Sequence, residues 1–175
     1  GVNGAGKTTT INALLNLVHR DSGIIKFRGK DISTDEKAFK DKIGVVFDSG
    51  CFYDELTIKD MTALLAPAYS EWDNYTYKQY LERFSLQQEQ TIGTLSKGMK
   101  MKYALALALS HNAELLIMDE PTSSLSDHEV QALFKVMRKL KSENVAIIYI
   151  SHRLKEILEI GDTLTVLRDG TLVDT

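Results

Sequence analysis

The chain has 175 residues, of which 43% are hydrophobic and 26% are charged, so it is long and apolar enough for one globular domain with a buried core. Its formal net charge is −3, with acidic and basic residues interspersed, which does not favour nucleic acid as a partner. A single cysteine excludes an internal disulfide. The longest apolar runs are too short to span a bilayer, so another chain would have to cross any membrane at which the protein works.

The sequence begins with GVNGAGKT (residues 1–8), which matches the phosphate-loop pattern G-x-x-x-x-G-K-[ST]. Apolar residues at helical spacing follow and predict a helix over 7–19. In such a loop, backbone N–H groups and the positive end of the helix attract phosphate oxygens, Lys7 contacts the β- and γ-phosphates, and the Thr8 hydroxyl ligates Mg²⁺. The plainer alternative is a glycine-rich turn before a helix. A phosphate loop normally follows a buried strand and none precedes Gly1, so we expect a fold that lacks its N-terminal strands.

The rest of the chain alternates strand patterns with helix patterns. Apolar runs predict four strands and a hairpin, at 24–27, 43–47, 115–118, 145–150 and 163–173. Capping-box patterns at Thr57 and Ser126 predict two helix starts, and Ser96 can cap a third helix. We therefore expect one α/β domain with a mostly parallel sheet over residues 1–175. Its nucleotide-binding core would comprise 1–49 and 112–175, and the run at 50–111, which has no convincing strand, would be a helical insert.

The strand predicted at 115–118 delivers two acids at its carboxyl end. Adjacent residues on a strand point in opposite directions, so the two carboxylates can take different roles. Asp119 can hold Mg²⁺, and Glu120 can face the γ-phosphate and polarise the attacking water. A lone pair of acids is often only a solvated strand end, but a phosphate loop in the same chain favours nucleotide hydrolysis. His152 follows the strand at 145–150, where it either caps the next helix or contacts the γ-phosphate from the carboxyl edge of the sheet.

Together these segments resemble the ATP-binding subunit of ABC transporters over nearly the whole chain. The resemblance rests on motifs in the family's order: GVNGAGKTT (Walker A), LSKGM (signature), LLIMDEPTSSLS (Walker B and D-loop) and ISHR (H-loop). It implies a P-loop NTPase fold, ATP and Mg²⁺ as ligands, and hydrolysis of ATP. It also implies a membrane-spanning permease and a second ATP-binding subunit as partners, with the protein peripheral on the cytoplasmic face of the cell membrane.

The resemblance also assigns roles to individual residues. Two such domains would pair head to tail, and Ser96 and Gly98 of one would offer a hydroxyl and a bare backbone N–H to the ATP held by the other. The alternative is a capped helix with an incidental glycine. Asp48 stands where the family has a glutamine that senses Mg²⁺, so it would reach the ion only through water. The phosphate contacts would be Gly1, Asn3, Gly4, Ala5, Gly6, Lys7, Thr8 and Thr9.

The subfamily signal is divided. The first two thirds, with Asp48, Trp72-Asp73 and the signature helix, resemble the ATPases of ABC-2-type exporters, whereas the last third is similar to the ATPases of sugar importers. Because the helical insert docks the permease, we expect an ABC-2-type exporter of drugs, antibiotics or peptides, with a sugar importer as the alternative. Two further classes stay open. One is a soluble ABC ATPase that acts on ribosomes or DNA ends. The other is a non-catalytic module or a degenerate half of a mixed dimer, suggested by Asp48, by Ser126 in place of the usual D-loop aspartate, and by the missing start.

Overall fold

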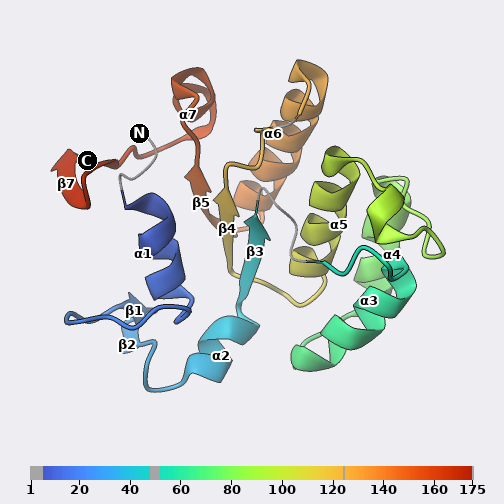
Figure 1. Cartoon of the computed structure of the whole chain (residues 1–175), viewed down its shortest axis with the longest axis horizontal. Helices are drawn as coiled ribbons and strands as arrows, with labels where there is room; N and C mark the ends of the chain where they lie inside the picture. Colours follow the sequence, from blue (N-terminus) through green and yellow to red (C-terminus); the bar gives the residue numbers. More distant parts are fainter. Residues whose placement is uncertain (1–5, 48–51, 124, 175) are drawn as a thin grey trace. The chain divides into compact units, whose positions relative to one another are not determined.

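The computed structural model describes residues 6–47, 52–123 and 125–174, which fold into two compact units (Figure 1). One unit combines the described residues of Gly1–Lys40 with those of Tyr149–Thr175, and the other is Asp41–Ile148. None of the helices in the described ranges has the length and apolarity needed to cross a membrane.

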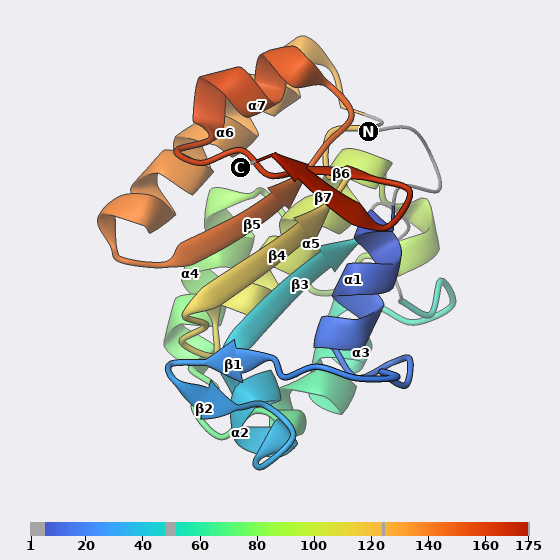
Figure 2. The same cartoon turned by 90° about the vertical axis from the view of Figure 1, so that its left-hand side faces the viewer.

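The larger unit is built on a parallel pair of strands, β3 (Ile43–Phe47) and β4 (Leu115–Asp119). Their register runs from Ile43 opposite Leu115 to Phe47 opposite Asp119. The sheet order is β3-β4-β5, with β5 at Ala146–Ile150, whose last two residues belong to the smaller unit, and Figure 2 shows these strands side by side. Residues 116–118 of β4 are fully buried, as expected for a parallel strand covered on both faces. The strands predicted at 43–47 and 115–118 are therefore confirmed.

Two long helices lie along the same side of the β3–β4 pair, α5 (Lys97–Leu109) and α6 (Asp127–Ser142) (Figures 1 and 2). Helix α5 packs very closely against β3. A methyl group placed on Gly44 would lie only 2.5 Å from the Cβ of Ala108. Helix α6 is amphipathic, and its buried stripe has the spacing of one helix face. The stripe consists of Val130, Leu133, Phe134, Met137 and Leu140.

Between β3 and β4 the described residues form helices and 3₁₀ turns joined by loops. These elements are α3 (Ile58–Leu65), η1 (Ala66–Ala68), α4 (Asn74–Arg83), η2 (Ile92–Thr94) and α5. The capping pattern at Thr57 is confirmed, because its side chain accepts a hydrogen bond from the backbone N–H of Asp60 at 3.1 Å. Helices α3, α4 and α5 meet at a buried cluster of hydroxyl groups contributed by Thr62, Tyr77 and Tyr103.

The smaller unit consists of short elements. They are α1 (Lys7–Leu14), β1 (Lys26–Phe27), β2 (Lys30–Asp31), α2 (Glu36–Asp41, whose last residue belongs to the larger unit), α7 (Leu154–Ile160), β6 (Val166–Arg168) and β7 (Thr171–Asp174). The predicted C-terminal hairpin is present as β6–β7. Asp169 and Gly170 both have left-handed backbones, with φ of 50° and 75°, as a two-residue hairpin turn requires.

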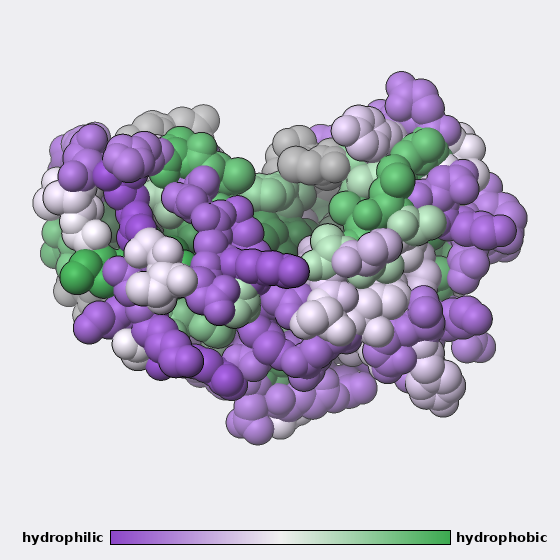
Figure 3. Space-filling view, turned by 90° about the horizontal axis from the view of Figure 1, so that it is seen from below, coloured by the Kyte–Doolittle hydropathy of each residue, from purple (hydrophilic) through white to green (hydrophobic). Residues whose placement is uncertain are grey.

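Two predictions for this unit were too long. The helix predicted over 7–19 ends at Leu14, and Asn16 takes a left-handed backbone with φ of 57°. Leu15, just past the helix, is still buried, but Leu17 and Val18 are 63% and 39% exposed, so the buried face ends at Leu15. The strand predicted at 24–27 is reduced to Lys26–Phe27, and Ile24 is 68% exposed. The face drawn in Figure 3 is predominantly hydrophilic and carries smaller hydrophobic patches.

Candidate functional site

The residues predicted to form the site are divided between the two units. Gly6, Lys7, Thr8, Thr9 and His152 belong to the smaller unit. Asp119, Glu120, Ser96 and Gly98 belong to the larger unit. The remaining predicted site residues lie outside the described residues: Gly1, Asn3, Gly4, Ala5 and Asp48.

The start of α1 has the local structure of an anion-binding helix terminus. Gly6 precedes the helix with a left-handed backbone, φ 89°, and its carbonyl oxygen accepts hydrogen bonds from the backbone N–H and the hydroxyl of Thr10, both at 2.9 Å. The first turn of α1 contains no acidic residue, so nothing within it neutralises the positive end of the helix. Thr8 and Thr9 are exposed. This end of α1 can therefore receive phosphate oxygens.

A glycine is required at position 6 for two reasons. Its positive φ is a conformation that residues with a side chain rarely adopt. In addition, a methyl group at this position would lie 3.0 Å from the Cα of Gly170, in the turn of the β6–β7 hairpin. The hairpin thus packs directly behind the phosphate-loop turn and restricts it to glycine.

The carboxyl end of β4 separates its two acids by a sharp change of backbone direction. Asp119 ends the strand opposite Phe47, whereas Glu120 has a left-handed backbone with φ of 49°. The carbonyl oxygen of Glu120 then accepts a hydrogen bond from the N–H of Ser123 at 3.1 Å. Strained conformations of this kind concentrate at functional sites. Both residues are partly exposed, and their separate roles toward a ligand stay predictions.

The signature segment begins α5. Ser96 is the N-cap, and its hydroxyl oxygen accepts a hydrogen bond from the N–H of Met99 at 3.2 Å, which confirms the predicted cap. Ser96 is exposed, but Gly98 is buried against its own chain. The atoms nearest to a methyl group on Gly98 would be Glu129 Oε1 and Leu125 Cδ2. Sequence reasoning found the capping box that contains Glu129 but not this contact, because the two residues lie on different helices.

His152 is exposed in the turn between β5 and α7. The N-cap residue of α7 is Arg153, so the alternative in which His152 caps that helix does not apply. The turn is fixed by the buried carboxylate of Glu156, which accepts hydrogen bonds from the hydroxyl groups of Tyr149 at 2.7 Å and Ser151 at 3.1 Å. Its other oxygen pairs with the Arg153 guanidinium at 3.0 Å. No sequence pattern indicated that Glu156 holds this turn.

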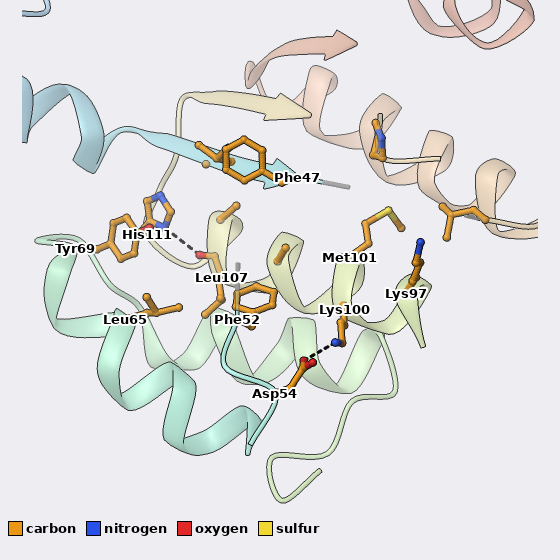
Figure 4. A pocket seen from close by; sticks show the side chains of 16 residues that line it. Phe47, Phe52, Asp54, Leu65, Tyr69, Lys97, Lys100, Met101, Leu107 and His111 are labelled. Atoms are coloured by element: carbon orange, nitrogen blue, oxygen red, sulfur yellow. Dashed lines mark hydrogen bonds and ion pairs between the residues drawn. The ribbon is translucent and has the colours of Figure 1, made fainter. Parts of the chain in front are cut away.

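The larger unit also contains a cavity of about 430 Å³, lined mainly by β3, α5 and the segment around α3 (Figure 4). At one end the buried ring of His111 stacks on Tyr69, with the ring centroids 3.8 Å apart. The two ring nitrogens of His111 lie 2.9 Å and 3.0 Å from the carbonyl oxygens of Leu107 and Ile43. At the other end Lys100 forms an ion pair with Asp54 at 2.6 Å.

A family model described as "ABC transporter" matches residues 1–123. This chain belongs to the ABC transporter ATP-binding family. It is 37% identical to the ribose import ATP-binding protein RbsA of Bacillus licheniformis and 36% identical to the galactose/methyl galactoside import ATP-binding protein MglA of Escherichia coli, in each case over 100% of the chain. It spans 38% and 37% of the length of these two relatives.

Solved structures of ABC transporter proteins have the same fold. A structure of an ATP-binding subunit of an ABC transporter matches 98% of this chain with a TM-score of 0.87 at 27% identity, and the match covers 74% of that subunit. The structure of cbiO1 from Clostridium perfringens matches 99% of the chain with a TM-score of 0.82 at 23% identity, covering 73% of cbiO1. The predicted P-loop NTPase fold with a mostly parallel sheet is thereby confirmed. ATP-binding subunits of ABC transporters are ATPases coupled to transport.

Proposed function

We propose that this ABC-family chain is the ATP-binding and ATP-hydrolysing part of a sugar importer. The observation that carries the proposal is its identity of 36–37% over the whole chain to ATP-binding proteins of ribose and galactose import. These relatives favour the sugar importer over the ABC-2-type exporter that the first two thirds of the sequence suggested. The start of α1 and the divergent acids after β4 supply the chemistry that such a subunit needs.

In this proposal the phosphate groups of ATP bind at the start of α1. Lys7 offers a positive charge to the β- and γ-phosphates, and backbone N–H groups of the first turn donate to the same oxygens. The hydroxyl of Thr8 and the carboxylate of Asp119 are hard oxygen donors of the kind that Mg²⁺ prefers, so each residue by its chemistry would be able to hold the ion. When bound, Mg²⁺ would supply positive charge that offsets the charge of the phosphate groups. Asp48 is assigned to the same ion through water.

Hydrolysis in this proposal depends on Glu120, with His152 as its partner at the γ-phosphate. Glu120 orients a water molecule for attack on the phosphorus atom, and it leaves the strand in a different backbone direction from Asp119. Hydrogen bonds from Ser151 to Glu156 and from the Arg153 N–H to Ser151 fix the turn that carries His152. The exposed imidazole of His152 contacts the γ-phosphate in this proposal. Ser96 and the first turn of α5 receive the nucleotide of a second ATP-binding subunit.

The proposed partners are that second subunit and a membrane-spanning permease, with the chain on the cytoplasmic face of the membrane. Residues 48–70 are assigned to the permease contact. Within the described part of that stretch, Tyr53 is 65% exposed and Leu64 is 61% exposed. Large apolar side chains that a partner protein covers in a complex are exposed in this way when the chain is alone.

The test is phosphate release by the complete protein assembled with its permease, measured with and without candidate sugars and their binding protein. Glu120→Gln keeps the side-chain size and removes the general base, so turnover is expected to cease while ATP still binds. Lys7→Ala removes a phosphate contact, so ATP affinity itself is expected to fall. A normal hydrolysis rate in Glu120→Gln, or unchanged affinity in Lys7→Ala, would contradict these assignments. Stimulation by an export substrate, and not by a sugar, would contradict the direction of transport.

A further inference from the structure

The first turn of α5 packs against the start of α6 through one glycine. Gly98 is buried, and a methyl group on its Cα would lie 2.7 Å from Glu129 Oε1 and 3.3 Å from Leu125 Cδ2. Non-bonded heavy atoms are most stable about 3.5–4.0 Å apart. Any residue larger than glycine at position 98 must therefore displace the carboxylate of Glu129 or the turn that begins α5.

The carboxylate of Glu129 is anchored by its own helix. Its Oε2 atom accepts hydrogen bonds from the backbone N–H of Ser126 at 3.0 Å and from the Ser126 hydroxyl at 2.8 Å. The Ser126 hydroxyl oxygen in turn accepts from the N–H of Glu129 at 3.4 Å, which completes a capping box. These hydrogen bonds from Ser126 lower the pKa of Glu129, with a smaller contribution from the charges of Lys102 and His128. The side chain is therefore ionised at neutral pH.

One oxygen of this carboxylate thus caps α6, while the other meets the first turn of α5. A negative charge near a helix N-terminus is favourable, so the contact suits α5 as well as α6. Leu125 and the start of α6 are in this way joined to the signature turn within a single chain. Leu125 is buried and forms the second wall of the contact.

We propose that Glu129 is a positioning residue for the signature turn and that Gly98 is required by this contact inside its own chain. The inference rests on the proposed function, in which the first turn of α5 receives ATP from a second subunit. Glu129 does not touch ATP in this scheme. It fixes where Ser96 and the N–H groups of the turn lie relative to the start of α6.

A double-mutant cycle in the complete protein tests the proposal. Gly98→Ala is expected to lower the urea midpoint of unfolding and the maximal rate of ATP hydrolysis, while the KM for ATP changes little because the phosphate loop is untouched. Glu129→Asp shortens the side chain by one methylene and makes room for the methyl group. In the Glu129→Asp background, Gly98→Ala is expected to have a clearly smaller effect on both the urea midpoint and the hydrolysis rate. Mutations of two residues in contact typically change each other's effect on an equilibrium constant by roughly two-fold to a hundred-fold.

Glu129→Gln is the matched control, because it keeps the length of the side chain and the capping bonds but removes the charge. It is expected not to rescue Gly98→Ala. Equal losses from Gly98→Ala in the parent and in Glu129→Asp would overturn the proposal, and so would rescue of stability without rescue of the rate. If the parent protein does not hydrolyse ATP at all, the proposed function fails, whereas the unfolding cycle still decides whether Gly98 and Glu129 are coupled.

Discussion

Replacing Thr62 by valine should destabilise the larger unit strongly, although valine has almost the same shape as threonine. Thr62 Oγ1 donates a hydrogen bond to the carbonyl oxygen of Ile58 at 2.7 Å. The hydroxyl groups of Tyr77 and Tyr103 lie 2.7 Å and 2.8 Å from the same oxygen atom. Because the proton of Thr62 is used by Ile58, Thr62 Oγ1 is the acceptor available to the two tyrosine hydroxyls, of which Tyr103 also donates to the Ile58 carbonyl oxygen. Tyr77 is 4% exposed and Tyr103 is 0% exposed, so water cannot replace a lost partner easily.

The size of the effect follows from counting hydrogen bonds. Valine removes the acceptor of both tyrosines, and Tyr103 keeps only a long contact to the Ile58 carbonyl at 3.3 Å. A buried donor left unpaired costs about 1–3 kcal/mol, so we expect Thr62→Val to lower the free energy of unfolding by about 2–4 kcal/mol. Replacing both partners of a hydrogen bond by apolar groups costs far less, because no buried donor is then left unpaired. The triple variant Thr62→Val/Tyr77→Phe/Tyr103→Phe should therefore be more stable than Thr62→Val alone.

Urea unfolding followed by far-UV circular dichroism is the assay. With a slope of about 2 kcal/mol per molar urea, the expected loss shifts the midpoint of Thr62→Val by about 1–2 M. Burial raises the pKa of both Tyr77 and Tyr103, so their hydroxyls stay protonated at the assay pH. A Thr62→Val variant within about 0.5 kcal/mol of the parent would show that the hydroxyl cluster does not hold α3, α4 and α5 together. A triple variant less stable than Thr62→Val would refute the hydrogen-bond count.

Two further predictions concern α5 and its surroundings. Gly44→Ala should destabilise by about 1–3 kcal/mol, because its methyl group would lie 2.5 Å from the Cβ of Ala108, and adding Ala108→Gly should recover part of that loss in the same urea assay. Burial lowers the pKa of His111, although its carbonyl partners and Asp41 oppose the shift. Below about pH 6.5 the histidine of the unfolded chain binds a proton, whereas His111 in the folded chain stays neutral to lower pH. The free energy of unfolding should therefore fall between pH 7 and pH 5. His111→Gln should have a flatter profile in that range, and an equally steep one would contradict the assignment.

The parts of the fold that the sequence predicted well depend on local patterns. The continuous apolar run at 115–118 identified β4, since a parallel strand buried on both faces has no polar alternation. The caps at Thr57, Ser96 and Ser126 identified three helix starts, because the side chain and the N–H it accepts from are only three residues apart. The same local reasoning extended α1 too far. Apolar residues 17 and 18 continue the helical spacing, but Asn16 turns the backbone and leaves both outside the core.

The parts that could not be predicted depend on residues far apart in the chain. Gly98 was assigned a role toward a nucleotide, and only the folded chain brings Glu129 and Leu125 against it. The cluster of Thr62, Tyr77 and Tyr103 likewise requires three helices to be packed before its hydrogen bonds exist. Motif spacing therefore identified candidate ligand contacts. The residues that position those contacts could be identified only from the tertiary structure.

The central claim is that ATP is held between two ATP-binding subunits, by the start of α1 in one and the start of α5 in the other. Sedimentation velocity on the complete Glu120→Gln protein, with Mg²⁺ and either ATP or ADP, tests it most directly. We predict a dimer with ATP and a monomer with ADP, and loss of the ATP-dependent dimer when Lys7→Ala or Ser96→Ala is added. The same sedimentation coefficient with ATP, with ADP and without nucleotide would contradict the account.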